Sequence, residues 1–446
     1  MSSKGLGKAA NGKERRSSTA TLSIFTVKAT PHKPVIRQPN AGLLAGFRIN
    51  VTRMSKPELI SAIGEEIARE GPIPFIRYME MALYHPEYGY YASPGEKIGW
   101  KGDYYTSSSV HPVFGELIAK QLTQMGVAMC QGGASEEPFT IVEMGAGKGT
   151  LCFDILNFIQ RVSPPFFDRL HYVIVEGSHW LREKQIAWLA PLFPRRLRWE
   201  DEIPKNLEGV VLSNELLDAF PVHRLRVEGE TVQEIYVDWR NGRFAEVLRS
   251  PSTHRLSTYL RRLNVRFNRP TELEINLVAL DWMRRVGRSL ARGFVVTIDY
   301  GYPAATLYTP RRPKGTFLCY YKHTANENPY EHVGEQDMTA HVDFTSLAQC
   351  GEKAGLKLLG FTDQTHFLMG LGIAQRMEGP ASRMNQSPEA RRTFLAMRQL
   401  MAPEGMGKVF KILIQGKNVP SDIRLDGLQF KPFFKFLTFL LIYLTM

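Results

Sequence analysis

The chain has 446 residues, of which 43% are apolar and 22% are charged, the composition of a folded globular protein. This length predicts one large domain with insertions or two domains. The first 57 residues hold +10 of the formal net charge of +12, so the body is nearly neutral, which argues against a broad basic face for nucleic acid.

Residues 1–53 are rich in Ser, Thr, Lys and Arg and contain one acid, Glu14. This composition predicts a disordered basic tail outside the fold. It is also compatible with an organellar transit peptide, and both interpretations stay open.

Three amphipathic helices are expected next. The stretch "SKPELISAIGEEIAREG" (55–71) has a Ser before its first turn, Pro57 inside it and a final Gly, which is the pattern of a complete helix. Further helices are expected over 74–84 and 112–129. Residues 54–130 are therefore predicted to form an N-terminal helical region that acts as a lid.

From residue 138 the pattern changes to strands that alternate with helices. Near-continuous apolar strands separated by helices are typical of a parallel sheet covered on both faces. The sequence thus predicts an α/β, Rossmann-like domain over residues 138–418 with a mostly parallel sheet. The expected strands are 139–144, 172–176, 209–214, 293–301 and 407–417.

An insertion is predicted over about 222–290. Residues 222–248 alternate apolar with polar side chains and contain the turn sequences "EGE" and "RNG", which predict an antiparallel meander. A helix is expected over 270–290. The apolar tail 419–446, and above all "FFKFLTFLLIYLTM" (433–446), either docks on the body or lies on a membrane surface, because it is too short to span a bilayer.

The stretch "TIVEMGAGKGTL" (140–151) places Gly145, Gly147 and Gly149 between a strand and a helix. The dinucleotide fingerprint requires a third glycine where Thr150 stands, and a phosphate-binding P-loop requires its lysine after the last glycine, whereas Lys148 precedes it. An acid followed by G-x-G-x-G is instead the pattern of class I S-adenosylmethionine-dependent methyltransferases.

Two carboxylates accompany this glycine turn. Glu143 is expected to orient local amides or to attract the cationic methionine end of the cofactor. Glu176 ends the next strand, where a carboxylate can accept hydrogen bonds from both ribose hydroxyls. The predicted cofactor-binding residues are thus Glu143, Gly145, Gly147, Gly149 and Glu176.

The third strand ends in "SNELLDAF", which supplies Asn214, Glu215 and Asp218. Active sites of open parallel sheets lie at the carboxyl ends of their strands, so these residues are predicted to face the methyl acceptor. Asp299 ends another buried strand and either faces the same site or binds its own turn. His341 is the other candidate to assist the acceptor. Four isolated cysteines and the absence of an HExxH motif predict no metal.

Several motifs in order resemble the MidA-like methyltransferases: "GPIPFIRYMEMALYHPEYGYY", "GDYYTSSSVHPVFGELI", "IVEMGAGKGTL", "NELLDAFPVHRL", "IDYGY" and "MTAHVDFTSL". The similarity covers about residues 55–417. The mitochondrial members of the family are assembly factors for respiratory complex I. The resemblance implies a Rossmann-like fold with inserted elements, S-adenosylmethionine as cofactor and dimethylation of a protein arginine.

The resemblance also directs attention to the polar loop "GDYYTSS". Asp103 is expected to contribute to catalysis and Thr106 to cofactor binding, as parts of a lid over the methionine moiety or the acceptor. The motif wording is closer to bacterial members, which favours a cytoplasmic protein, with a mitochondrial location as the alternative. A respiratory-complex assembly partner is possible on the same ground.

The predicted reaction is attack of a guanidino nitrogen on the sulfonium methyl group. Glu215 with Asp218 is expected to hold the planar guanidinium, because paired carboxylates match its fork of donors. Two alternatives remain: a cofactor-binding assembly chaperone with little turnover, and a methyltransferase for a small molecule or lipid.

Overall fold

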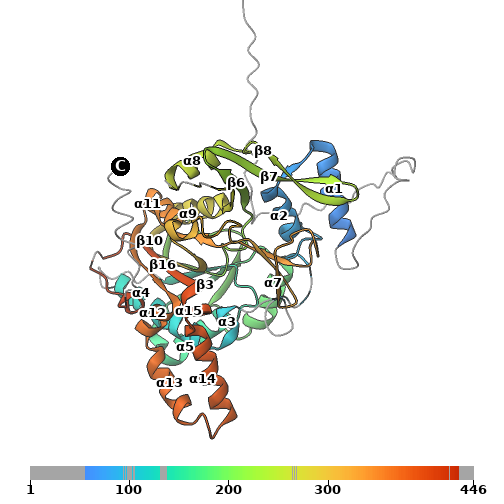
Figure 1. Cartoon of the computed structure of the whole chain (residues 1–446). Helices are drawn as coiled ribbons and strands as arrows, with labels where there is room; N and C mark the ends of the chain where they lie inside the picture. Colours follow the sequence, from blue (N-terminus) through green and yellow to red (C-terminus); the bar gives the residue numbers. More distant parts are fainter. Residues whose placement is uncertain are drawn as a thin grey trace, which may run out of the picture.

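The computed structural model describes residues 56–430, apart from residues 94, 96, 98–102, 104–105, 131–137, 264, 266, 268 and 421. The predictions for residues 1–53 and 433–446 lie outside the described residues. Figure 1 shows a central sheet with helices around it, a smaller sheet beside the N-terminal helices, and a helical hairpin that projects from the body.

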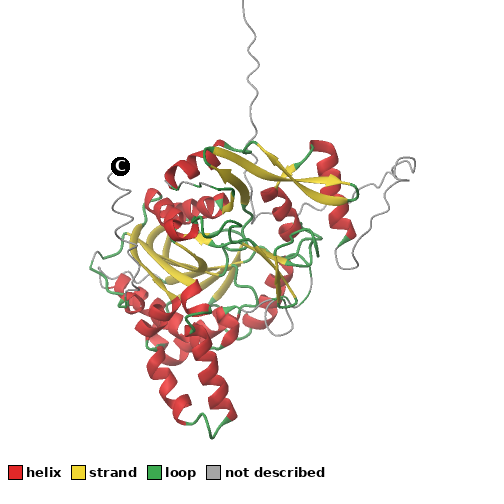
Figure 2. Cartoon of the chain, viewed as in Figure 1, coloured by secondary structure: helices red, strands yellow, loops and turns green. Residues whose placement is uncertain are grey.

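The central sheet follows the order β15–β16–β10–β5–β2–β3–β4. The strands from β10 to β4 are parallel, whereas β16 is antiparallel to both of its neighbours. This confirms the predicted mostly parallel sheet (Figure 2). The strands are β15 (Lys357–Asp363), β16 (Phe410–Lys417), β10 (Leu290–Tyr302), β5 (Leu207–Asn214), β2 (Phe139–Met144), β3 (Leu170–Val175) and β4 (Leu197–Glu200), and β14 (Val342–Asp343) pairs with β10.

Helices bury both faces of this sheet, as its uninterrupted apolar strands require. On β2, Ile141 packs in one core with α4 (Val113–Cys130) and α5 (Thr150–Val162). Val142 and Met144 point the other way, into a core with α9 (Leu277–Ser289) and α11 (Phe344–Lys353). From β2 the chain builds β3 and β4 on one side and then returns to β5 on the other. The carboxyl ends of β2 and β5 therefore flank the switch point at which ligands of open sheets bind.

The predicted meander is the core of a second, antiparallel sheet. β6 (His223–Glu228), β7 (Thr231–Arg240) and β8 (Arg243–Arg249) pair in sequence, and Gly229 and Gly242 make the turns with φ of +58° and +76°. The helix expected over 270–290 is wrong at its start. "TELEI" instead forms β9 (Thr271–Ile275), which pairs with β6 at the edge of this sheet, and α9 begins only at Leu277.

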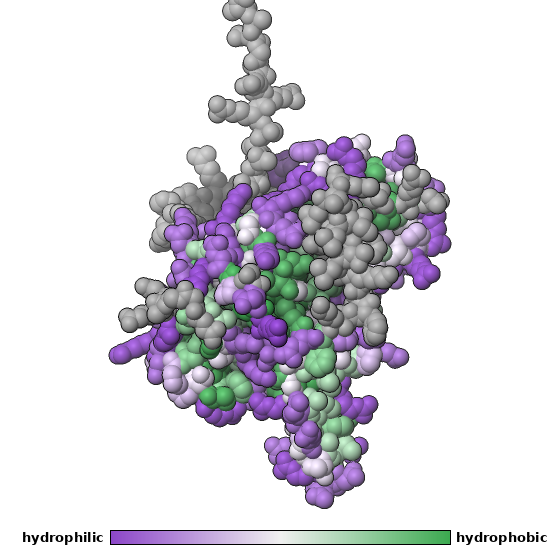
Figure 3. Space-filling model, turned by 90° about the vertical axis from the view of Figure 1, so that its left-hand side faces the viewer, coloured by the Kyte–Doolittle hydropathy of each residue, from purple (hydrophilic) through white to green (hydrophobic). Residues whose placement is uncertain are grey.

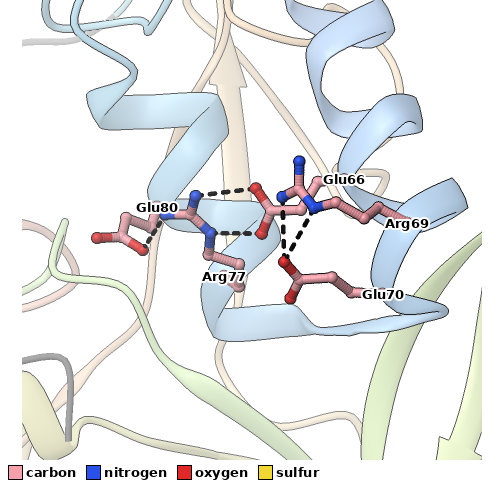
Figure 4. Close-up of polar contacts among 5 residues, drawn as sticks. All are labelled: Glu66, Arg69, Glu70, Arg77 and Glu80. Atoms are coloured by element: carbon pink, nitrogen blue, oxygen red, sulfur yellow. Dashed lines mark hydrogen bonds and ion pairs between the residues drawn. The ribbon is translucent and has the colours of Figure 1, made fainter. Parts of the chain in front are cut away.

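The N-terminal helices α1 (Pro57–Glu70) and α2 (Phe75–Tyr84) pack against this second sheet, and β1 (Ile73–Pro74) between them pairs with β7. Arg77 joins the two helices (Figure 4). Its guanidinium donates to both carboxylate oxygens of Glu66 at 2.7 and 2.9 Å and to Glu80 at 2.8 Å. The planar fork fixes the angle between α1 and α2 more than it adds stability, because the pair is partly solvated.

Further elements had no sequence prediction. A third sheet of β12 (Thr324–Asn326), β11 (Leu318–Tyr321) and β13 (Asp337–Thr339) packs against the N-terminal helices. After β15 the chain forms α12 (Gln364–Leu371) and then a hairpin of α13 (Ile373–Ser382) and α14 (Pro388–Met401). Figure 3 shows that hairpin as an arm with mixed polar and apolar surface.

Candidate active site

The glycine turn leads from β2 into α5 through three left-handed residues. Gly145, Gly147 and Gly149 have φ of +70°, +55° and +79°, values at which a side chain is strained. Space adds to the restriction at Gly145, where a Cβ would lie 2.7 Å from Leu216 Cδ1. The turn at the carboxyl end of β2 therefore requires glycine, and it packs against Leu216 at Gly145 and against Leu189 at Gly149.

Glu176 follows β3 and lies against this turn. Its Oε2 accepts a hydrogen bond from the Gly147 amide at 3.2 Å and another from Gln185 Nε2 at 3.1 Å. Its Oε1 accepts from the Ser178 amide at 3.0 Å, and Gln185 also donates to the Gly147 carbonyl at 2.7 Å. Burial raises the pKa of Glu176, while these donors act in the opposite direction. A carboxylate aligned on a glycine turn suits a ligand with vicinal hydroxyls.

Glu143 lies on the face of β2 that packs toward α5. Its side chain is 2% exposed and accepts a hydrogen bond from the Tyr172 hydroxyl at 2.8 Å. Burial raises its pKa to about 7, so the carboxyl group is half-protonated near neutral pH. Its predicted role at the methionine end of a cofactor stays a prediction.

Glu215 lies directly after β5 in the left-handed conformation, with φ of +51°. Its Oε1 accepts hydrogen bonds from the Ser107 amide at 2.8 Å and from Asn214 Nδ2 at 3.2 Å. Ser107 is the first residue of the short helix α3 (Ser107–Val110). Burial raises the pKa of Glu215 to about 8, and the nearby charge of Asp218 adds to this increase. Asn214 places its own Oδ1 in a buried position with no partner among the described residues.

Asp218 is 6% exposed and accepts a hydrogen bond from the Tyr300 hydroxyl through Oδ2. Its Oδ1 is buried and has no hydrogen-bond partner among the described residues. Burial raises the pKa of Asp218 to about 6. A buried carboxylate oxygen without a hydrogen-bond donor costs free energy. A cationic ligand with N–H donors would remove this cost.

Asp299 binds the backbone between Glu215 and Asp218. It is fully buried, and its Oδ2 accepts hydrogen bonds from the amides of Leu216 and Leu217 at 3.2 and 2.8 Å. Of its two predicted roles, the structure favours turn-binding, although the turn belongs to the neighbouring strand β5. Asp299 therefore fixes the segment that carries Glu215 and Asp218.

Asp337 is a further buried acid near Asp218, and the sequence analysis did not predict it. It is 3% exposed at the start of β13 and accepts a hydrogen bond from the Tyr91 hydroxyl at 2.7 Å. Burial raises its pKa to about 8, with a further contribution from the charge of Asp218. The one available signal was its place directly before "MTAHVDFTSL", a motif of the resemblance.

Tyr84 joins the cofactor side to the acid side. Its hydroxyl donates to the Ala219 carbonyl at 2.9 Å. Burial raises the pKa of Tyr84 well above its usual value, and the charges of Asp337, Asp218 and Glu176 raise it further. One tyrosine thus lies within electrostatic range of both predicted halves of the site.

The predicted lid residues lie near the buried acids. Asp103 accepts hydrogen bonds from the Tyr90 hydroxyl and the Lys322 amide, each at 2.7 Å, and its charge contributes to the raised pKa of Asp337. Thr106 is the N-cap of α3 and shares a hydrogen bond of 3.1 Å with the Ser108 hydroxyl. Both thus order backbone near the acids, and their predicted contacts with acceptor and cofactor stay predictions.

His341 is held between two aromatic rings, 5.4 Å from Tyr300 and 5.5 Å from Tyr302. Burial lowers its pKa to about 4, so it is neutral at physiological pH. The described part of the chain contains no group of three or more His, Cys, Asp or Glu residues that could hold a metal ion. No described helix is long and apolar enough to cross a membrane.

Comparisons with known proteins decide which chemistry this site serves. A family model described as "Putative S-adenosyl-L-methionine-dependent methyltransferase" matches residues 116–362, more than half of the chain. The chain belongs to this family. The match covers the glycine turn, Glu176 and the acids from Glu215 to Asp337, so these residues lie in a methyltransferase whose cofactor is S-adenosylmethionine.

A solved structure supports the assignment. A "likely methyl transferase" from Burkholderia thailandensis, bound to S-adenosyl-homocysteine, is 31% identical with a TM-score of 0.73, over 83% of this chain and 94% of that chain. A native structure from the same organism gives a TM-score of 0.72 at the same identity and coverage. The α/β methyltransferase fold with an added antiparallel sheet is thereby confirmed.

Curated relatives carry a more specific name. The Drosophila melanogaster relative, a mitochondrial protein arginine methyltransferase NDUFAF7 homolog, is 26% identical over 85% of this chain and 91% of its own length. The Homo sapiens protein arginine methyltransferase NDUFAF7, also mitochondrial, is 25% identical over 77% of this chain and 80% of its own length. The predicted resemblance to the MidA-like methyltransferases agrees with these relatives.

Proposed function

We propose that this methyltransferase transfers methyl groups to an arginine side chain of a protein substrate, with dimethylarginine as the product. The observation that carries the proposal is the cluster of Glu215, Asp218 and Asp337, three acids with raised pKa values at the acceptor side of the site. The names of the relatives from Drosophila melanogaster and Homo sapiens point to the same acceptor.

The cofactor side uses the glycine turn and Glu176. The three glycines of the turn carry no side chains, and the Glu176 carboxylate is already aligned by the Gly147 and Ser178 amides. This arrangement fits a nucleoside whose two ribose hydroxyls donate to one carboxylate. When bound, S-adenosylmethionine supplies an electrophilic methyl group that already has a good leaving group.

The acceptor side binds the guanidinium. Glu215 and Asp218 lie on one turn after β5, and the unpartnered Oδ1 of Asp218 is available to a donor. A guanidinium has five N–H donors in a plane and is protonated at neutral pH. Two carboxylates therefore fix its plane and turn one nitrogen toward the cofactor side. Alignment of this kind is worth roughly 7–11 kcal/mol in favourable cases.

The raised pKa values give the acids a second role in proton transfer. Glu215, with a pKa of about 8, is mostly protonated at pH 7 before substrate arrives. A guanidinium beside it favours the carboxylate form, so the proton leaves as the arginine binds. After methyl transfer the nitrogen must lose a proton, and the same carboxylate is placed to accept it.

The test is transfer of a tritiated methyl group into a lysate from cells that lack this protein, followed by mass mapping of the labelled peptide. Label in dimethylarginine supports the proposal. Label in the organic-extractable fraction would support the small-molecule or lipid alternative. Tight S-adenosylmethionine binding without any label would support the assembly-chaperone alternative, and either result would overturn arginine methylation.

The location and the assembly partner stay predictions. A cytoplasmic protein was predicted from the motif wording, whereas the mitochondrial names of the curated relatives support the alternative, in which residues 1–53 serve as a transit peptide. Microscopy of the full-length chain tagged at its C-terminus separates the two. The mapped substrate will also show whether the target is a respiratory-complex subunit.

A further inference from the structure

Gln364, the first residue of α12, is fully buried next to the catalytic region. Both ends of its amide are used. Oε1 accepts a hydrogen bond from the Ser107 hydroxyl at 3.2 Å, and Nε2 donates to the Leu400 carbonyl of α14 at 2.8 Å. A buried amide is costly unless both ends are bonded, so this geometry specifies the position of each partner.

Ser107 continues this link to Glu215. Its side chain is fully buried, and its amide donates to Glu215 Oε1 at 2.8 Å. The hydroxyl and the amide of one residue thus bond two different segments of the chain. A continuous path of hydrogen bonds runs from the end of α14 through Gln364 and Ser107 to the acid of the acceptor side.

Helix α3 needs such an external anchor. It has only four residues, and a single helical turn is not stable by itself. The capping box of Thr106 and Ser109 holds the first turn of α3 together from within, and the bond from the Ser107 hydroxyl to Gln364 ties that turn to α12. Glu215 depends on the Ser107 amide, because its backbone already has the uncommon left-handed conformation and its other recorded donor is the adjacent Asn214.

We propose that Gln364 is a positioning residue for methyl transfer, which acts through Ser107 to hold the Glu215 carboxylate in the orientation that binds the acceptor. The inference rests on the proposed function of Glu215. It goes beyond that function because Gln364 lies more than a hundred residues away in sequence and, among the described residues, is linked to the acid through Ser107 of α3.

The chain offers a matched control in the next residue. Thr365 makes the parallel bond between the same two helices, from its hydroxyl to the Met401 carbonyl at 3.0 Å. Its recorded hydrogen bond does not involve α3. Thr365→Val therefore loosens the α12–α14 junction by one hydrogen bond and leaves the link to Ser107 intact.

The experiment compares Gln364→Met, Ser107→Ala and Thr365→Val with the full wild-type chain. Amide hydrogen exchange at Ser107, single-turnover methyl transfer to a peptide that carries the mapped arginine, and S-adenosylhomocysteine affinity are measured. In Gln364→Met we expect exchange at Ser107 to accelerate at least about tenfold and transfer to slow by about 10- to 100-fold, since small misplacements have effects of this size. The affinity for S-adenosylhomocysteine should change less than about twofold, and Thr365→Val should match wild type.

Three results would overturn the proposal: unchanged exchange at Ser107 in Gln364→Met, faster exchange with undiminished transfer, or an equal loss in Thr365→Val. If Gln364→Met does not fold, Ser107→Ala, which removes only the hydroxyl, provides the same comparison. The double variant Gln364→Met with Ser107→Ala should transfer methyl groups no more slowly than Gln364→Met alone, because both substitutions remove the same hydrogen bond. If wild type methylates no arginine, the proposed function fails separately, and the exchange result alone decides whether Gln364 positions α3.

Discussion

The two proposed halves of the active site, a cofactor side and an acceptor side, differ in how many hydrogen-bond donors their carboxylates already have. On the cofactor side, Glu176 accepts hydrogen bonds from the amides of Gly147 and Ser178 and from Gln185, so both of its oxygens are occupied. On the acceptor side, Asp218 keeps one buried oxygen without a partner among the described residues, and burial together with the charge of Asp218 raises the pKa of Glu215.

This difference shows that the two halves are prepared in different ways. On the proposed cofactor side, hydrogen bonds from two main-chain amides and from Gln185 already hold the Glu176 carboxylate, so it needs to move little when a ligand binds. The acceptor side holds several acids close together at a cost in free energy, which a bound cation can repay. A charged acceptor such as guanidinium is therefore part of what stabilises the site. Variants of the acceptor side should therefore lose methyl transfer and keep cofactor affinity, whereas variants of the cofactor side should lose cofactor affinity.

The largest effect is expected from Glu215→Gln, which removes a charge but keeps the shape of the side chain. Single-turnover methyl transfer to the mapped peptide should fall by about 10²- to 10³-fold, the loss of one buried charge-assisted contact. Calorimetry should show S-adenosylhomocysteine affinity unchanged within about twofold. An equal loss of cofactor affinity would show that the two halves are not separate.

Glu176→Gln should produce the converse result. The affinity for S-adenosylhomocysteine should weaken by about 10- to 100-fold, because a neutral amide is a poorer partner for two hydroxyls. Transfer at saturating cofactor should stay within a few-fold of wild type. Unaltered affinity in calorimetry would remove Glu176 from the cofactor site.

The acceptor side should also determine how the rate of methyl transfer depends on pH. The carboxylate form of Glu215 binds guanidinium, and its pKa of about 8 lies above the usual value. The kcat/KM for the arginine peptide should therefore rise by up to about tenfold per pH unit between pH 6 and 8 and level off above pH 8. Glu215→Gln should flatten this part of the profile. A wild-type profile that is flat from pH 6 to 8 would count against the assignment.

The smallest effect concerns stability. A carboxyl group whose folded pKa is raised binds its proton more tightly in the folded state, so its contribution is favourable at low pH and is lost as pH rises toward the folded pKa. Asp337, with a pKa of about 8, should thus destabilise the unliganded protein increasingly from pH 5 to 8. Asp337→Asn should raise the free energy of unfolding by about 1 kcal/mol more at pH 8 than at pH 7. Thermal melts at both pH values test this, and an equal change at both would contradict it.

The sequence predicts more residues of the proposed cofactor side than of the proposed acceptor side. The glycine turn is consecutive in the chain, and Glu176 ends the next strand, so local pattern and strand order sufficed to predict this side. Glu215 could be predicted in the same way, because it directly follows β5. Asp337 and Gln364 could not be predicted in this way, since tertiary packing brings their segments to the site.

The fold shows the same limit. Uninterrupted apolar strands predicted the parallel sheet, and two glycine turns predicted the meander. "TELEI" was misjudged as part of a helix because five residues cannot show which edge of a sheet they will join. The α13–α14 hairpin was missed, although Ser387 before Pro388 is an N-cap pattern, because Pro380 lies inside the first of its helices.

The most direct measurement of the central claim is the proton balance of acceptor binding. Calorimetry of the mapped arginine peptide with the S-adenosylhomocysteine-loaded protein, at pH 7 in buffers of different ionisation enthalpy, gives the number of protons exchanged. Guanidinium binding beside an acid with a pKa of about 8 predicts release of about one proton per peptide, which Glu215→Gln should abolish. No proton release, or release that persists in Glu215→Gln, would contradict the assignment of this acid to the acceptor.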